Sequence, residues 1–274
     1  MVIPTVPLAG STPVDFPLLG LGTWPMTGRE CADAVRSALE TGYRLIDTAA
    51  QYGNEDGVGQ GLAESDVPRA DIVVTTKLAG RDQGNVRQAL EASLTKLGLD
   101  YVDVYLIHWP NPMDEKYLPS FEQMLTAQQE GLIRVVGVSN FLPEHLDRLK
   151  AATGVFPAVN QIQFCPQVTR DDLRAFHDSN GIHTEGWRPF GVGLLDHPSV
   201  RAVAQETGRT PAQVLLRWQV QQGVSTIPKS GHPARQAANL EIFAFELSAD
   251  QLGRLSALDE GVPDNYDPRT HSEY

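Results

Sequence analysis

The sequence predicts a (β/α)8 barrel, and three observations support that fold class. From about residue 18, short apolar runs alternate with longer stretches of helical periodicity, and the alternation occurs eight times. Most of the short runs are continuously apolar, as expected of parallel strands that are covered on both faces. Several helical stretches end in glycine just before the next strand, for example at Gly98 and Gly181. Glycine commonly ends a helix in the left-handed conformation, and eight such units close a barrel.

The eight predicted strands are spaced along most of the chain. They cover residues 18–23, 43–49, 72–78, 102–109, 135–140, 158–164, 182–187 and 224–229. Between them, amphipathic segments such as 30–42 and 85–98 place their apolar residues on one helical face. Strands that alternate with helices predict a parallel sheet with right-handed crossovers. An open, doubly wound sheet is the alternative architecture.

Further elements flank the predicted barrel. Residues 5–19 are expected to form a small N-terminal β-hairpin that plugs the bottom of the barrel. After the eighth unit, residues 248–260 have a helical pattern, and a tail rich in proline and aspartate follows over residues 264–274. No linker, low-complexity stretch or internal repeat divides the sequence. We therefore expect residues 1–274 to form a single domain.

Composition and charge exclude several classes of partner. The chain has 34 acidic against 22 basic residues and a net charge of −12, which disfavours nucleic acid and acidic membrane surfaces. No apolar run approaches the roughly 18 residues that span a bilayer, and no secretion signal is expected. The two cysteines, Cys31 and Cys165, allow at most one disulfide. We expect a reduced, cytoplasmic, monomeric protein without a metal site.

Four ionisable residues lie at or just after the ends of consecutive predicted strands. Asp47 and Lys77 are in the second and third strands, His108 is in the fourth, and Tyr52 lies in the loop after the second. Catalytic groups of this fold sit at the carboxyl ends of the strands. Taken singly, each residue also suits a structural role, such as a turn aspartate or a surface tyrosine. Their conjunction predicts a functional cluster.

The four side chains together have the chemistry of a proton donor. A phenol has a pKa of about 10, and a nearby ammonium group lowers it by stabilising phenolate. Lys77 would supply that cation, Asp47 would keep it charged, and His108 would orient a substrate oxygen. Tyr52 would then be the acid. Tyr52 and His108 would stabilise the negative charge that develops on a carbonyl oxygen when hydride reaches the carbon.

The chain resembles the aldo-keto reductase superfamily in six segments that follow the family's order. They are LIDTAAQYGNE, TTKL, YLIHWP, GVSNF, PAVNQIQ and IPKS. The resemblance covers essentially the whole chain and is greatest to bacterial members of the 2,5-diketo-gluconate reductase type. It implies NADPH-dependent reduction of a carbonyl to an alcohol. The family's catalytic tetrad falls on Asp47, Tyr52, Lys77 and His108.

The resemblance also implies a set of cofactor-binding residues. Ser139, Asn140 and Gln161 match positions that bind the nicotinamide amide, and Trp187 would stack on the nicotinamide ring. Serine and asparagine also suit ordinary turns, and Trp187 also suits a core position. The full predicted set is Thr23, Asp47, Ser139, Asn140, Gln161, Trp187, Arg188, Gly191, Gly193, Leu194, Lys229, Ser230, Arg235 and Asn239.

A phosphate site is predicted in the loops after the seventh and eighth strands. Backbone amides at Gly191 and Gly193 could approach a pyrophosphate closely. Lys229 and Ser230 lie in the last loop, and Arg235 lies in the first turn of the following helix. Arg235 resembles the family's ligand for the 2′-phosphate, which favours NADPH over NADH. A solvated helix face is the structural alternative for Arg235.

The predicted substrate pocket is small. Its walls are expected to be Trp24, Tyr52, His108, Trp109 and Asn111, with the C-terminal tail closing one side. This mixture of aromatic and polar groups suits a small polar carbonyl compound. The sequence departs from the family pattern at Ala79, which is expected to widen the pocket, and at Gln163, Cys165, Arg188 and Ala238. Arg188 would contact either the cofactor pyrophosphate or an acidic substrate.

Two other functions stay open at this point. Lys77 could act as a Schiff-base lysine in a barrel aldolase, although pairing with Asp47 would keep the amine charged. The chain could also be a structural or cofactor-sensing protein on the same scaffold, without turnover.

Overall fold

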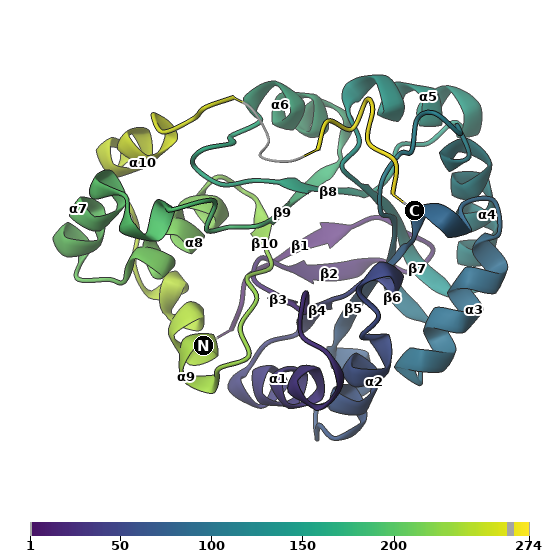
Figure 1. The fold of residues 1–274 in the computed structure, drawn as a ribbon, viewed down its shortest axis with the longest axis horizontal. Helices are drawn as coiled ribbons and strands as arrows, with labels where there is room; N and C mark the ends of the chain where they lie inside the picture. Colours follow the sequence, from purple (N-terminus) through teal and green to yellow (C-terminus); the bar gives the residue numbers. More distant parts are fainter. Residues whose placement is uncertain (1, 262–265, 274) are drawn as a thin grey trace.

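Eight parallel strands form the central sheet of the computed structural model, which describes residues 2–261 and 266–273 (Figure 1). Their sheet order follows the chain order. They are β3 (Leu21–Gly22), β4 (Leu45–Asp47), β5 (Val73–Leu78), β6 (Val102–Ile107), β7 (Ile133–Ser139), β8 (Val159–Gln163), β9 (His183–Trp187) and β10 (Ser225–Thr226). The predicted number of strands and their parallel pairing are confirmed.

The sheet closes on itself between its first and last strands. Isolated parallel bridges join Leu19 to Thr226 and Gly22 to Lys229, and the Gly20 amide donates to the Thr226 carbonyl at 2.9 Å. This closure confirms the barrel and excludes the open sheet. β3 and β10 are shorter than predicted, because pairing at the seam runs through isolated bridges instead of a continuous ladder.

Helices follow the strands and form the outer layer seen in Figure 1. They are α1 (Gly28–Thr41), α2 (Glu55–Ala63), α3 (Val86–Leu97), α4 (Tyr117–Gln129), α5 (Pro143–Thr153), α6 (Asp171–Asn180), α7 (Pro198–Thr207), α8 (Pro211–Gln221), α9 (Pro233–Leu240) and α10 (Ala249–Ser256). Short 3-10 turns lie at Ala50–Tyr52, Arg69–Asp71, Gly80–Asp82, Leu194–Asp196 and Glu241–Ala244. Gly98 and Gly181 end α3 and α6 with φ of 67° and 68°, as predicted for left-handed helix ends.

The N-terminal hairpin lies across the end of the barrel opposite the pocket described below. It pairs β1 (Thr5–Leu8) with β2 (Val14–Pro17), and Figure 1 draws both strands across the barrel centre. Phe16 is fully buried and belongs to the same apolar cluster as Val104 and Val135 inside the barrel. The hairpin therefore fills the bottom of the barrel, as its sequence predicts.

Alternation along the strands aims polar side chains at the interior of the barrel. In β6, Val104 and Leu106 pack in the interior cluster, whereas Tyr105 and Ile107 pack toward the helices. Because side chains alternate with a period of two, His108 also faces the interior. The same period places Asp47 two residues after the inward-facing Leu45. Inward-facing positions are thus apolar in the middle of these strands and polar at their carboxyl ends, so the polar side chains converge at that end of the barrel.

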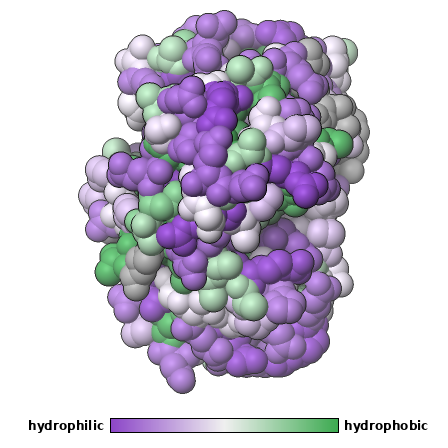
Figure 2. Space-filling view, turned by 90° about the vertical axis from the view of Figure 1, so that its left-hand side faces the viewer, coloured by the Kyte–Doolittle hydropathy of each residue, from purple (hydrophilic) through white to green (hydrophobic). Residues whose placement is uncertain are grey.

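The predicted C-terminal helix is α10, and the Ser248 hydroxyl caps it by accepting from the Gln251 amide. Of the predicted tail, residues 264, 265 and 274 lie outside the described residues. Within the described part of the chain, no helix is both long and apolar enough to cross a membrane. Figure 2 shows a face on which hydrophilic residues predominate and apolar residues are scattered.

Candidate active site

A pocket of about 720 Å³ opens at the carboxyl end of the barrel strands. The structure brings together there many of the residues that the sequence singles out: Thr23, Trp24, Asp47, Tyr52, His108, Trp109, Ser139, Asn140, Gln161, Trp187, Arg188, Gly191 and Lys229. The sequence reasoning missed Gly22, Pro25, Pro189, Phe190, Ile227 and Tyr266, which also line it. Most of these are apolar residues in loops, where no periodicity marks the side that faces a pocket.

Lys77 lies behind the pocket wall and is fully buried. Its Nζ donates to Asp47 Oδ1 at 2.7 Å, to the Thr48 carbonyl at 2.9 Å and to Tyr52 Oη at 3.3 Å. The three contacts use all three protons of the ammonium group. Asp47 and Lys77 come from adjacent strands, and Tyr52 comes from the 3-10 turn directly after β4. The pairing predicted between these three residues is therefore present.

Burial and the neighbouring charges act in opposite directions on this cluster. Burial raises the pKa of Tyr52, and the Lys77 charge lowers it by a smaller amount, so that the net pKa is raised. The sequence reasoning considered only the cation and expected a lowered pKa, which is wrong because loss of solvent around the half-buried ring has the larger effect. Burial alone would lower the pKa of Lys77, but Asp47 and Tyr52 raise it above its usual range. Tyr52 is therefore a phenol and Lys77 an ammonium ion at neutral pH.

His108 stands beside the Tyr52 ring. The two ring centroids are 5.7 Å apart, with an interplanar angle of 75°. The His108 backbone carbonyl accepts a hydrogen bond of 3.1 Å from the Asn140 side chain. Tyr52 and His108 both line the pocket, so a small molecule in it can meet both side chains.

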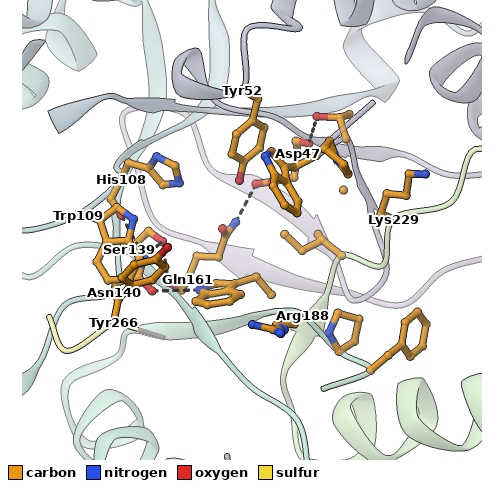
Figure 3. A pocket seen from close by; sticks show the side chains of 18 of the residues that line it. Asp47, Tyr52, His108, Trp109, Ser139, Asn140, Gln161, Arg188, Lys229 and Tyr266 are labelled. Atoms are coloured by element: carbon orange, nitrogen blue, oxygen red, sulfur yellow. Dashed lines mark hydrogen bonds between the residues drawn. The ribbon is translucent and has the colours of Figure 1, made fainter. Parts of the chain in front are cut away.

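A row of amide and hydroxyl groups forms the floor of the pocket. Gln161 Nε2 donates to Asp47 Oδ2 at 2.7 Å, and the Ser139 hydroxyl donates to the Gln161 carbonyl at 2.8 Å. Trp187 Nε1 donates to Asn140 Oδ1 at 3.0 Å, which fixes the indole against the floor (Figure 3). This floor combines a broad aromatic face with groups that can hydrogen-bond a carboxamide.

Glu185 is a buried carboxyl group that the sequence reasoning did not single out. It accepts a 2.7 Å hydrogen bond from the same Gln161 nitrogen that contacts Asp47. Burial, followed by the charge of Asp47, raises the pKa of Glu185 to about 8. At neutral pH, Glu185 is therefore a neutral acid below the pocket floor. Its position two residues before Trp187, on the same face of β9, was a readable signal.

Positive side chains line the other end of the pocket. Figure 3 shows Lys229 on the opposite side from His108, Trp109 and Tyr266. Lys229 is exposed, and its Nζ lies 3.7 Å from Glu30 Oε1. Arg188 has a left-handed backbone with φ of 57° and is half-buried. This end is open and cationic, in contrast to the closed cluster around Lys77.

Several predicted residues do not line the pocket. Gly193, Leu194, Ser230, Arg235 and Asn239 lie in or near the loops after β9 and β10. Arg235 is exposed on the first turn of α9, and buried Asn239 hydrogen-bonds Tyr43. Ser230 Oγ donates to the His232 carbonyl at 3.3 Å.

Asn111, predicted as a pocket wall, is buried, and its side chain bonds the backbone of Glu273. It does so through both its amide nitrogen and its amide oxygen, so that Asn111 holds the C-terminal tail in place.

The departures from the family pattern lie around the pocket. Ala79, Gln163 and Cys165 are buried, and none of them is among the lining residues, so widening of the pocket by Ala79 stays a prediction. Cys31 and Cys165 are not joined in a disulfide. Among the described residues, no cluster of His, Cys, Asp and Glu is arranged to hold a metal ion.

Comparisons with known proteins agree with this geometry. A model of the aldo/keto reductase family matches residues 18–260. The chain is 47% identical over 273 residues to an aldo-keto reductase of Mycolicibacterium vanbaalenii, covering 98% of this chain and 97% of the relative. It is 44% identical over 256 residues to methylglyoxal reductase DkgA of Escherichia coli K12, covering 92% and 93% of the two chains.

Among solved structures, a mutant of Gox0644 in complex with NADPH superposes with a TM-score of 0.92 at 38% identity. The match covers 98% of this chain and 99% of that one. The chain belongs to the aldo/keto reductase family. It is accordingly an NADPH-dependent oxidoreductase with a (β/α)8 fold, and the amides of the floor and the cations of the rim suit a dinucleotide of that kind.

Proposed function

We propose that this enzyme reduces aldehyde or ketone groups of small polar compounds to alcohols, with Tyr52 as the proton donor. The observation that supports the proposal is the Tyr52 hydroxyl in the pocket wall, 3.3 Å from a buried ammonium group. NADPH, when bound, supplies the hydride. The chain's own residues then have to hold the carbonyl and deliver one proton to its oxygen.

Tyr52 has the protonation state that this role needs. Its raised pKa keeps the phenol protonated at neutral pH, so that a proton is available for the nascent alkoxide. As the proton leaves, the Lys77 ammonium stabilises the phenolate, and Asp47 holds that ammonium in place at 2.7 Å. His108, beside the Tyr52 ring, orients the substrate oxygen.

The residues that would hold the cofactor fall into two groups. Ser139, Asn140 and Gln161 offer hydroxyl and amide groups to the nicotinamide carboxamide, and Trp187 offers an aromatic face. At the open end, the predicted loops after β9 and β10 carry the groups for the phosphates, with Arg235 for the 2′-phosphate. The residues that we propose for the phosphate end and its adenosine are Arg188, Gly191, Gly193, Leu194, Lys229, Ser230, Arg235 and Asn239. Thr23 and Asp47 would lie near the nicotinamide.

A small substrate fits the other end. Trp24, Trp109 and Tyr266 line it beside Tyr52 and His108, which leaves few groups for a large polar ligand. The similarity to methylglyoxal reductases of the DkgA type supports 2-keto aldehydes and related 2-keto or diketo compounds as candidates. We propose that the enzyme acts as a monomer in the cytoplasm; two buried cysteines that form no disulfide support the reducing compartment.

The aldolase alternative has less support. A Schiff-base lysine needs an uncharged amine, whereas Lys77 is buried against Asp47 and uses its three protons in hydrogen bonds. A purely cofactor-sensing role would not require Asp47, Lys77 and Tyr52 to contact one another.

The test is NADPH consumption with a panel of aldehydes, 2-keto acids and dicarbonyls, measured for the wild type and for Tyr52→Phe. We expect the wild type to consume NADPH and Tyr52→Phe to lose about 10²–10⁴ in kcat, with NADPH affinity retained. Tyr101→Phe, outside the pocket, is the matched control. Full activity of Tyr52→Phe would refute the assigned acid. Borohydride trapping of a substrate adduct on Lys77 would favour the aldolase instead.

A further inference from the structure

The described end of the C-terminal tail is docked beside the pocket by a specific set of contacts. The Glu273 side chain is only 8% exposed, and its backbone amide donates to Asn111 Oδ1 at 2.9 Å. Asn111 Nδ2 donates in return to the Glu273 carbonyl at 3.1 Å. The Gly80 amide donates to Glu273 Oε2 at 2.8 Å. Glu273 is therefore held through its backbone and through one of its carboxylate oxygens.

Gly80 allows the tail to come this close. A Cβ atom at Gly80 would lie 2.1 Å from the Glu273 carbonyl oxygen and 2.2 Å from Asn111 Nδ2. Any larger residue would displace the tail. The tail is also held by aromatic contacts, since the rings of Trp109 and His271 have centroids 4.4 Å apart. This part of the tail is thus bound in a site that its own barrel builds.

The other carboxylate oxygen of Glu273 reaches the pocket histidine. Glu273 Oε1 lies 2.6 Å from His108 Nδ1. Nδ1 is buried, and no other polar atom of the described residues makes a hydrogen bond with it. Two lone pairs repel at such a separation, so this contact requires a proton on one of the two atoms. Burial alone raises the pKa of Glu273, but His108, the Gly80 amide and His271 together outweigh burial and lower that pKa.

A carboxylate at this position determines which ring nitrogen carries a proton. If Glu273 is ionised, the proton lies on His108 Nδ1. In the neutral ring, Nε2 then has no proton and can only accept a hydrogen bond. It donates one only when the ring carries both protons. The second nitrogen of such a histidine is thus controlled by the partner of the first.

We propose that Glu273 is a positioning residue, by which the C-terminal tail fixes the orientation of His108 and keeps a proton on its Nδ1. The inference rests on the proposed function for the assignment of His108 as the group that orients the substrate oxygen. The tail is then part of the active site and not only a wall of the pocket. Nε2 of such a ring can donate to a carbonyl oxygen only when both nitrogens carry a proton, and a carboxylate at position 273 would balance the charge of that form.

The substitution Glu273→Gln reverses this arrangement. The Gly80 amide still needs an acceptor, and the glutamine side-chain oxygen takes that place. The glutamine NH₂ group then faces His108 Nδ1 and can only donate to it. In the neutral ring, the proton therefore moves to Nε2, although the tail keeps its contacts with Asn111 and Gly80.

The test is nitrogen NMR of the full chain labelled with ¹⁵N-histidine, at about pH 9, well above the usual histidine titration. The chain has seven histidines, and a His108→Gln variant assigns the signals of residue 108. We expect the wild type to have a protonated Nδ1 and an unprotonated Nε2, and Glu273→Gln to have the reverse. Glu144→Gln, which removes an ion pair of 3.0 Å with Arg269 of the tail, is the control and should keep the wild-type pattern.

The same tautomer in the wild type and in Glu273→Gln would overturn the proposal, as would an unprotonated Nδ1 in the wild type. The charged and titratable groups around His108 and Glu273 are Asp47, Tyr52, Lys77 and His271, and all four remain in each variant. The spectra require no turnover, so they test the tail contact even if the enzyme reduces none of the carbonyl compounds in the panel. Failure of the panel assay with the expected spectra would count only against the proposed function.

Discussion

The two ends of the pocket are built differently. At the end with Tyr52 and Lys77, the polar groups are buried or half-buried and are joined to one another by hydrogen bonds of 2.7 to 3.3 Å. At the other end, Lys229 is exposed, and its contact with Glu30 is a loose one of 3.7 Å. One end is preassembled, and the other is open to solvent.

This difference agrees with the functions that we propose for the two ends. Proton transfer gains from groups that are fixed before the reaction, since no reorganisation is then needed in the transition state. A site for a charged dinucleotide has to open and close, and exposed cations attract a phosphate ligand at little structural cost. Because the whole molecule carries a net charge of −12, the cations of the rim are needed to offset the repulsion of that ligand.

The comparison predicts the largest effect at the buried end. Lys77→Met removes the cation between Asp47 and Tyr52, and should lower kcat at least about a hundredfold. It also leaves a buried carboxylate without its partner, so the free energy of unfolding should fall by about 3–5 kcal/mol. Steady-state kinetics and urea denaturation measure the two effects. Lys116→Met, on the exposed start of α4, is the control, and a kcat within twofold of wild type for Lys77→Met would contradict the account.

Glu185 gives the buried end a pH-dependent stability. Its pKa in the folded chain is raised from 4.5 to about 8, so the unfolded chain releases this proton at lower pH than the folded chain. Stability that Glu185 contributes at low pH is therefore lost between about pH 4.5 and 8. Glu185→Gln carries no such proton. Relative to wild type, its free energy of unfolding should rise across this window, by up to the order of 5 kcal/mol.

Denaturant titrations of both proteins at about pH 5 and pH 9 measure this difference. Glu122→Gln, an exposed acid on α4, is the matched control. A Glu185→Gln difference that is equal at both pH values would mean that the carboxyl is ionised throughout, and that the pocket floor is not a low-polarity environment.

At the open end, the expected effect is smaller and selective. Arg235→Ala should weaken NADPH binding about tenfold, or about 1.4 kcal/mol, and change NADH binding by less than twofold. Protein fluorescence titrations with each dinucleotide measure the two affinities. Arg201→Ala, an exposed arginine on α7, is the control. Equal losses for both dinucleotides would show that Arg235 does not read the 2′-phosphate.

Much of the barrel and of the buried cluster could be predicted from sequence, because strand periodicity carries the information. Asp47, Lys77 and His108 lie at the carboxyl ends of strands whose inward phase is readable, so their convergence could be expected. The net direction of the Tyr52 pKa could not be predicted, because it depends on how completely the ring is buried. Glu185 had a readable signal in the same phase as Trp187, which was overlooked.

The tail could not be placed from sequence. Its contact with His108 depends on hydrogen bonds between Glu273 and Asn111, which lie more than 160 residues apart in the chain. It also depends on a close approach of the tail to the barrel, which the absence of a side chain at Gly80 allows. No local pattern in residues 266–273 reports these partners. The tail was expected to close one side of the pocket, whereas its contact with a catalytic candidate became visible only in three dimensions.

The most direct test of the central claim, that Tyr52 is the proton donor, is the pH dependence of kcat/KM in both directions. Reduction needs the phenol and oxidation needs the phenolate. The account predicts that carbonyl reduction by the wild type falls as pH rises, whereas oxidation of the corresponding alcohol increases toward alkaline pH. Parallel pH profiles in the two directions would contradict it.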